Sequence, residues 1–198
     1  MNIVVVKTLI HSVCLAWLGI EYYQAITDSG IADPVEQVIH FTGKGALNLV
    51  IFTLMLTPLA RFFKTNKPIL VRRLMGLYAF FYAALHLLSF FAFELAFNFN
   101  LLMQELVERP YIWVGAGAFI ILFALAVTSF HKAKKLLKKR WQSVHNLIYL
   151  GVLLAWLHFF WSRKADLLEP GMYLAVILLL LALRWKKIAR IFTLKNTK

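Results

Sequence analysis

Long apolar stretches alternate with short polar segments along the whole chain. Six stretches are about 20 residues long, which is enough for an α-helix to cross the hydrocarbon core of a bilayer. They cover about residues 8–26, 40–60, 74–97, 111–130, 144–162 and 171–187. The joining segments 27–39, 61–73, 98–110, 131–143 and 163–170 are too short to hold a soluble catalytic domain. The pattern predicts an all-α polytopic membrane protein, with residues 1–198 forming a single transmembrane domain of six helices.

The composition supports a lipid environment. Of the 198 residues, 61% are apolar and only 16% are charged, which is less charge than a soluble domain of this size carries. Cys14 is the only cysteine. The sequence therefore excludes an intrachain disulfide and a metal cluster held by several cysteines.

The charged residues predict how the helices are oriented. Segments 61–73 and 131–143, the tail from Arg184 and the N-terminal Lys7 are basic and contain no acid. The other three joining segments hold seven acids against three basic residues: Asp28, Asp33, Glu36, Glu105, Glu108, Asp166 and Glu169 against Arg109, Arg163 and Lys164. The positive-inside rule places both termini in the cytoplasm and the acidic segments outside. The net charge of +13 thus reflects topology and does not indicate a nucleic-acid partner.

Two histidines lie deep within the predicted spans. About 13 apolar residues precede each of His86 and His158 on the cytoplasmic side, which corresponds to about 20 Å of helix. Because the third and fifth spans run in the same direction, the two imidazoles should lie at nearly the same depth. A lone histidine in a membrane helix is often only hydrogen-bonded to a neighbouring helix, whereas two at matched depth favour a shared ligand.

The neighbours of these histidines favour a flat, apolar ligand. Ala83 lies on the helical face of His86, and Gly151 and Ala155 lie on that of His158. Such small residues leave space beside an imidazole, although close helix packing also uses them. Haem held by two axial imidazoles would explain the space and the histidines together.

His145 and His11 are weaker candidates for haem ligands. His145 precedes His158 by 13 residues, about 20 Å along a helix, which suits two haems stacked across the bilayer. The two side chains would, however, point about 140° apart around an ideal helix. The matching depth on the third span holds Arg72 and Arg73. The partner of His145 is therefore unassigned, and His11 is the best-placed alternative.

The remaining polar residues and glycine motifs have ordinary structural explanations. Glu21, Lys44 and Glu94 lie near the ends of spans and can reach the membrane interface. The G-K-G at 43–45 lacks the spacing of a phosphate-binding loop and indicates close helix packing. No internal repeat is apparent.

Several motifs together resemble the MsrQ family, also called YedZ. They are A-D-P-V at 32–35, I-H-F-T-G at 39–43, T-P-L-A-R at 57–61, R-R-L-x-G-L at 72–77 leading to His86, R-P-Y at 109–111, and R-W-Q-x-x-H-N-x-x-Y-L at 140–150 followed by His158. They occur in the same order and span nearly the whole chain. This family belongs to the ferric-reductase-like transmembrane superfamily, together with the membrane halves of NADPH oxidases.

The resemblance implies a b-type haem electron-transfer subunit in the bacterial inner membrane. It would pass electrons from quinol, or from a cytoplasmic flavin reductase, to MsrP, a periplasmic molybdopterin enzyme that reduces methionine sulfoxide in oxidised proteins. Carried over by motif, His86, His145 and His158 become haem ligands, for one or two haems b, and FMN is implied by resemblance alone. The wider superfamily has a second histidine on its third span, where this chain has only His86.

Two other functions compete with this interpretation. One is the membrane component of an NADPH-oxidase-like ferric or oxygen reductase, and the other is a small proton-coupled transporter that uses Glu94 and the histidines. As an electron relay the chain would not be catalytic alone. Its acidic outer segments would suit a basic patch on a periplasmic partner.

Overall fold

The computed structural model describes residues 2–163, 167–186 and 188–189, and every regular element in these ranges is helical. The helices are α1 (Ile3–Thr27), α2 (Pro34–Phe62), η1 (Lys67–Val71), α3 (Arg72–Ser89), η2 (Phe90–Glu94), α4 (Phe99–Glu108), α5 (Tyr111–Val127), α6 (His131–Leu137), α7 (Arg140–Asn146), α8 (Ile148–Ser162) and α9 (Leu168–Ala182). The predicted all-α class is confirmed.

Helix length and composition support several membrane spans. Within the described residues, four continuous helical segments are long and apolar enough to cross a membrane: Ile3–Thr27, Pro34–Phe62, Lys67–Glu94 and Arg140–Ser162. Helices α4 and α5 make a fifth candidate if this pair, which bends by 109°, is one span. Helix α9 is apolar but has only 15 residues. The structure confirms a multi-pass protein with four to five candidate spans, whereas a count of six and one domain over 1–198 stay predictions.

Helix α4 departs from the sequence-based expectation, because residues 98–110 were predicted to form only a joining segment. Asn98 caps this helix, and its side-chain oxygen accepts hydrogen bonds from the backbone N–H groups of Asn100 (2.9 Å) and Leu101 (3.2 Å). A capping residue followed by mixed apolar and polar residues is a local helix signal. With only 10 residues, the helix is shorter than the apolar stretches that predict membrane spans.

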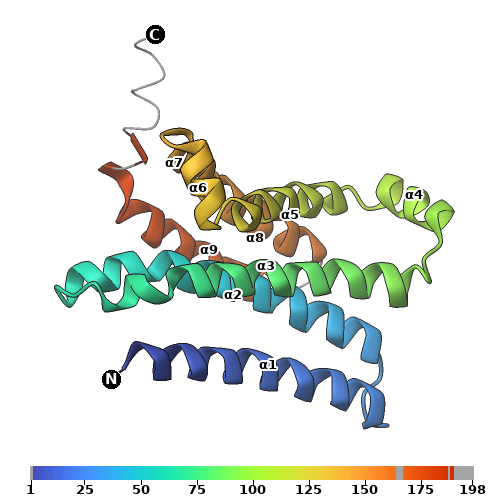
Figure 1. Cartoon of the computed structure of the whole chain (residues 1–198). Coiled ribbons are helices and arrows are strands. Elements are labelled where there is room, and N and C mark those ends of the chain that lie inside the picture. Colours follow the sequence, from blue (N-terminus) through green and yellow to red (C-terminus); the bar gives the residue numbers. More distant parts are fainter. Residues whose placement is uncertain (1, 164–166, 187, 190–198) are drawn as a thin grey trace.

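The core forms where four helices meet. Helix α2 packs most extensively against α3, and α5 packs against α8. Figure 1 shows α2 and α3 running alongside each other through the middle of the molecule, with α1 on one side and α5 and α8 on the other. Deeply buried apolar side chains come from α2, α3, α8 and α9 and include Leu54, Ala79, Val152 and Ile177. Many large apolar side chains face outward instead, as lipid solvation allows.

Helix α1 is attached to α3 by polar contacts along its length. The numbering rises together on both helices, so α1 and α3 run parallel, as alternating spans predict. The contacts are His11 Nδ1 with the Tyr78 hydroxyl (2.6 Å), the Tyr82 hydroxyl donating to the Cys14 carbonyl (2.6 Å), and the hydroxyls of Tyr22 and Ser89 (2.7 Å). Such contacts suit a helix that packs in lipid, where apolar burial drives association only weakly.

The connections gather at two ends of the molecule. Figure 1 shows η1 and α6 towards one end, and the turn after α1 together with α4 at the other. The first end carries the basic segments and the second carries acids, so the fold separates charge as the sequence predicts. Lys164, Asp166 and the tail residues Lys187, Arg190, Lys195 and Lys198 lie outside the described residues. Placement of the basic end in the cytoplasm stays a prediction from the positive-inside rule.

Candidate functional site: a pair of opposed histidines

The imidazole of His86 is held by the carbonyl of a neighbouring helix. His86 lies in the last turn of α3, and its Nδ1 is 2.9 Å from the backbone oxygen of Ile39 on α2. A carbonyl can only accept, so Nδ1 must carry the proton. In a neutral ring, Nε2 is then an unprotonated acceptor, the form that binds a metal.

His158 on α8 repeats this arrangement. Its Nδ1 is 2.8 Å from the backbone oxygen of Tyr111, the first residue of α5. The Tyr111 ring also lies against the imidazole, with ring centroids 5.6 Å apart. The same tautomer follows, with Nδ1 donating and Nε2 unprotonated. Both predicted histidines therefore have an orienting hydrogen bond on the same ring nitrogen.

A glycine packs directly against each imidazole. A Cβ built on Gly43 would lie 3.0 Å from His86 Nδ1, and one built on Gly115 would lie 2.7 Å from His158 Nδ1. Any larger residue at either position would push the ring away from its carbonyl partner. The small residues beside the rings thus come from the partner helices α2 and α5. Gly151, predicted to leave space beside His158, packs instead against Ile121.

The two imidazoles meet between the helix pairs. Their ring centroids are 6.0 Å apart and their planes are inclined by 78°. Two imidazoles that share one metal ion, each bound through a ring nitrogen at about 2 Å, have ring centres roughly 6 Å apart. The predicted match in depth is therefore found in the structure.

The two halves of the site share the same spacing of carbonyl, glycine and histidine along the sequence. The sequence-based expectation of no internal repeat did not include this short pattern. His86 and His158 each follow their carbonyl acceptor by 47 residues. The interval from Gly43 to His86 equals the interval from Gly115 to His158. Gly43 begins G-K-G at 43–45, and Gly115 begins G-A-G at 115–117. The predicted packing role of G-K-G is confirmed, since a Cβ on Gly45 would lie 2.5 Å from the Tyr82 ring. The recurring G-x-G before each histidine was the signal that could have revealed the glycines.

His145 lies in a separate environment at the end of α7. Its Nε2 is 3.2 Å from the Thr128 hydroxyl, and its ring stacks on Trp141 with centroids 4.0 Å apart. The Trp141 indole N–H donates to the Thr128 carbonyl at 2.9 Å, and Lys134 lies over the indole. These contacts fix the turn between α5 and α8 at the basic end, and a role for His145 in haem binding stays a prediction.

His11 is placed on α1 against α3. Its Nδ1 is 2.6 Å from the Tyr78 hydroxyl, and the rings meet edge to face at 5.4 Å. Among the described residues, no hydrogen bond or ring contact joins His11 to His145. The structure therefore brings His86 and His158 together, and it gives His11 and His145 different neighbours.

Several other polar groups in or near the spans are paired. Lys44 forms an ion pair with Glu169 of α9, and Gln37 donates to Glu21 at 3.1 Å. His40 lies 3.2 Å from Glu36, one turn earlier on α2. Pairing lowers the cost of placing such groups in or near lipid. Contacts within α2 and between helices therefore account for these residues.

Comparison with known proteins identifies the family. Residues 42–156 match the family described as ferric reductase like transmembrane component. The chain is 45% identical over 175 residues to the protein-methionine-sulfoxide reductase heme-binding subunit MsrQ of Cronobacter sakazakii, covering 88% of this chain and 86% of that protein. It is 40% identical over 197 residues to the protein of the same name from Xanthomonas oryzae pv. oryzae, covering 95% and 89%.

The similarity to these relatives covers most of the chain and is not confined to single motifs. The MsrQ of Salmonella arizonae is 44% identical over 175 residues, covering 87% of this chain and 86% of that protein. The matched residues 42–156 hold Gly43, His86, Gly115 and His145, and end two residues before His158. With this identity over most of both chains, the protein belongs to the MsrQ family of ferric reductase like transmembrane components.

Proposed function

We propose that this protein binds haem between His86 and His158 and relays electrons across the bacterial inner membrane to a periplasmic methionine sulfoxide reductase of the MsrP type. The single observation that carries the proposal is the opposed pair of imidazoles, each held through Nδ1 by a backbone carbonyl. The names of the relatives describe haem-binding subunits of a methionine sulfoxide reductase.

The residues present fit a haem ligated by two histidines. Both rings keep Nε2 unprotonated, and no hydrogen bond within the described residues involves that atom in His86 or His158. The site lies between apolar helices, with Gly43 and Gly115 allowing close approach to the rings. An imidazole in an apolar membrane interior needs a partner, and an iron ion supplies one.

Each residue of the site has a distinct task. Haem, when bound, supplies a one-electron carrier whose potential depends on its axial ligands and on their hydrogen bonds. The carbonyls of Ile39 and Tyr111 orient the rings and make the imidazoles more electron-rich ligands. Gly43 and Gly115 keep the rings within reach of those carbonyls.

The role that we propose is electron relay and not bond-making chemistry, because the relatives' names describe a haem-binding subunit. Among the described residues, no group of three or more histidine, cysteine or acidic side chains could hold a metal ion by itself. Two further parts of the proposal rest on the resemblance alone. The electron donor would be quinol or a cytoplasmic flavin reductase, and a second haem would lie near His145. The relatives' names mention haem and not FMN, so we assign no FMN site to this chain.

Absorbance spectroscopy of the purified protein tests the proposal. The wild-type protein should show a low-spin b-type haem spectrum, whereas a transporter should be colourless. His86→Ala and His158→Ala should each abolish the low-spin signal of this haem. His145→Ala is the control, because it changes a histidine outside the pair and should leave that signal largely intact.

One result would show that the ligands are assigned wrongly. In that result, His158→Ala keeps a full low-spin spectrum, whereas His11→Ala or His40→Ala loses it. A second haem ligated by His145 would appear as a separate component that disappears in His145→Ala alone.

A further inference from the structure

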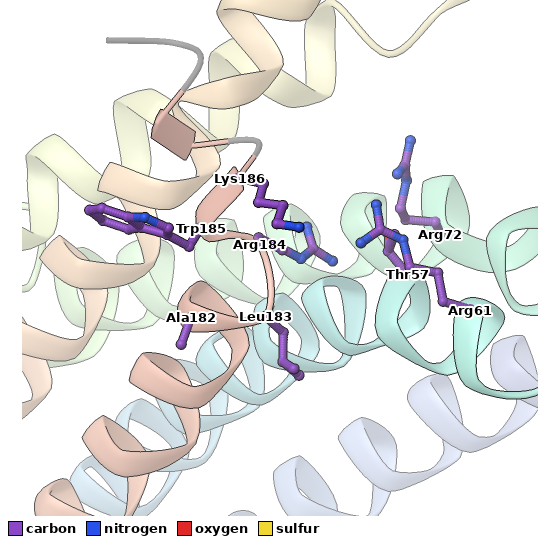
Figure 2. Close-up of a pocket in the computed structure, with 8 residues that line it drawn as sticks. All are labelled: Thr57, Arg61, Arg72, Ala182, Leu183, Arg184, Trp185 and Lys186. Carbon is purple, nitrogen blue, oxygen red and sulfur yellow. The ribbon is translucent and has the colours of Figure 1, made fainter. Parts of the chain in front are cut away.

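A basic pocket lies at the end of the molecule remote from α4. Its volume is about 720 Å³. Figure 2 shows Thr57, Arg61 and Arg72 on one side, facing Arg184 and Lys186 from the segment after α9, with Trp185 beside them. The pocket therefore joins the end of α2 and the start of α3 to the end of α9.

The described part of the chain supplies no acid to neutralise the positive charge of this pocket. Its lining holds three arginines and one lysine and contains no acid. Among the described residues, no ion pair involves Arg61, Arg72, Arg184 or Lys186. The sequence also places no acid in segments 61–73 or 131–143. Cations gathered around one space repel each other, so a bound anion would stabilise the arrangement.

Arg184 is fixed in position by a break in the backbone pattern of α2. Pro58 lies inside this helix and has no N–H for the carbonyl of Leu54. The Arg184 guanidinium donates to that carbonyl through Nη2. The buried Nε of Arg184 and the buried hydroxyl of Thr57 have no hydrogen-bond partner within the described structure. Two unpartnered polar groups thus accompany the cations that line the pocket.

The chemistry of the lining selects a phosphate group. Guanidinium groups bind the oxygens of phosphate through paired hydrogen bonds, and a hydroxyl adds a further donor. The pocket lies at the basic end, where the spans meet the membrane surface, and indole rings such as that of Trp185 favour this level. Basic pockets between helices at the cytoplasmic surface bind anionic lipid headgroups.

We propose that this pocket, lined by Thr57, Arg61, Arg72, Arg184 and Lys186, is a binding site for a phosphate group. Two sources can supply that group: the headgroup of an anionic phospholipid, or a soluble phosphate compound from the cytoplasm. The site is distinct from the histidine pair, and its occupation is measured without reference to electron transfer.

The first experiment tests lipid as the source. Purified protein is titrated with phosphatidylglycerol or phosphatidylcholine in detergent, and bound lipid is measured by native mass spectrometry. Phosphatidylglycerol should bind in preference to phosphatidylcholine. In Arg61→Gln/Lys186→Gln, affinity for phosphatidylglycerol should fall roughly 10- to 30-fold, because two cations near an anionic group are lost. This variant keeps Arg184 and its bond to Leu54.

The second experiment tests a soluble source. The protein is placed in phosphatidylcholine nanodiscs and titrated with inorganic phosphate by calorimetry. Saturable binding in the wild type that is lost in Arg61→Gln/Lys186→Gln would support the site and assign it to a soluble phosphate compound. Lipid selectivity without phosphate binding would support the site and assign it to the membrane.

A matched variant separates a site from general surface charge. Lys132→Gln/Lys135→Gln also removes two exposed cations, from α6 outside the pocket. It should retain binding in both experiments. The proposal is wrong if neither ligand binds, or if this variant lowers binding as much as the pocket variant does.

Discussion

At the scale of single residues, backbone carbonyls rather than side chains orient the histidine pair. Ile39 and Tyr111 each lie within a helix, and their oxygens accept from His86 and His158 at 2.9 and 2.8 Å. A backbone acceptor introduces no ionisable group next to the imidazole. It fixes the same ring nitrogen in both histidines, which leaves the two Nε2 atoms chemically equivalent.

The packing glycines give the first prediction, for Gly115→Ala. The added Cβ would lie 2.7 Å from His158 Nδ1, which forces the ring away from the Tyr111 carbonyl. Overpacking of this kind costs about 1–3 kcal/mol, so haem affinity should fall roughly tenfold. Haem titration of the purified apoprotein measures this. Gly43→Ala, with its Cβ at 3.0 Å, should show a smaller loss.

A glycine in open space provides the control for this prediction. Nothing lies within 4 Å of a Cβ built on Gly19 of α1, so Gly19→Ala should leave haem affinity unchanged. Equal affinity in Gly115→Ala and wild type would mean that the glycine does not position His158.

Sequence alone predicted the histidines of the site but not their supports. Depth along two parallel spans singled out His86 and His158, because distance along a helix follows directly from residue number. The carbonyls of Ile39 and Tyr111 leave no trace in side-chain identity, since every residue carries a carbonyl. Which glycine faces which ring depends on the rotation of α2 and α5, and the sequence does not define that rotation.

At the scale of elements, Pro58 couples the end of α2 to the segment after α9. The missing N–H of Pro58 leaves the Leu54 carbonyl without its helical partner, and Arg184 replaces that partner from 130 residues away. A helix interrupted by proline thus obtains a contact with a distant part of the chain. This contact also fixes one wall of the basic pocket.

A double-mutant cycle provides the second prediction. Arg184→Gln should destabilise the protein by about 1–3 kcal/mol, because it leaves the partly buried Leu54 carbonyl without its partner. Pro58→Ala restores a helical N–H, so Arg184→Gln should cost less in that background. Thermal unfolding in detergent measures both costs. Equal costs in the two backgrounds would show that the Leu54 contact contributes nothing to stability.

The elements themselves were predictable to different degrees. Long apolar stretches identified α1, α2, α3 and α8, because the length needed to cross a bilayer is fixed by its thickness. The bend of 109° between α4 and α5 was not predicted, since tertiary packing sets the angle between helices. The fourth and sixth predicted spans became helices of only 17 and 15 residues.

At the scale of the whole molecule, the route by which electrons enter gives the third prediction. The joining segments are short, and the described residues form helices without a sheet. The isolated protein should therefore not oxidise NADPH, and electrons should enter only from quinol or a separate flavoenzyme. Stopped-flow absorbance with NADPH alone measures this. Rapid haem reduction without a flavoenzyme would contradict the prediction.

The acidic end of the molecule gives the last prediction, which concerns docking of the periplasmic reductase. Sequence alone selects Asp33, Glu36, Glu105 and Glu108 as docking charges. The structure gives two of them internal roles. Asp33 caps α2 by accepting from the Glu36 N–H at 2.8 Å, and Glu105 pairs with Arg109 at 2.8 Å. Glu36 lies 3.2 Å from His40 on the same helix, but its carboxylate is exposed, as is that of Glu108. These two carboxylates can therefore face a basic partner.

Glu36→Gln/Glu108→Gln should therefore slow electron delivery to the reductase and weaken its dependence on salt, because complementary charges mainly raise the association rate. Turnover of haem-reduced protein with the reductase, measured at increasing ionic strength, gives both values. Lys132→Gln/Lys135→Gln changes as many charges at the opposite end and should behave as wild type. Unchanged rate and salt dependence in the acidic variant would place docking elsewhere, whereas a loss at low salt that disappears at high salt would locate it at this surface.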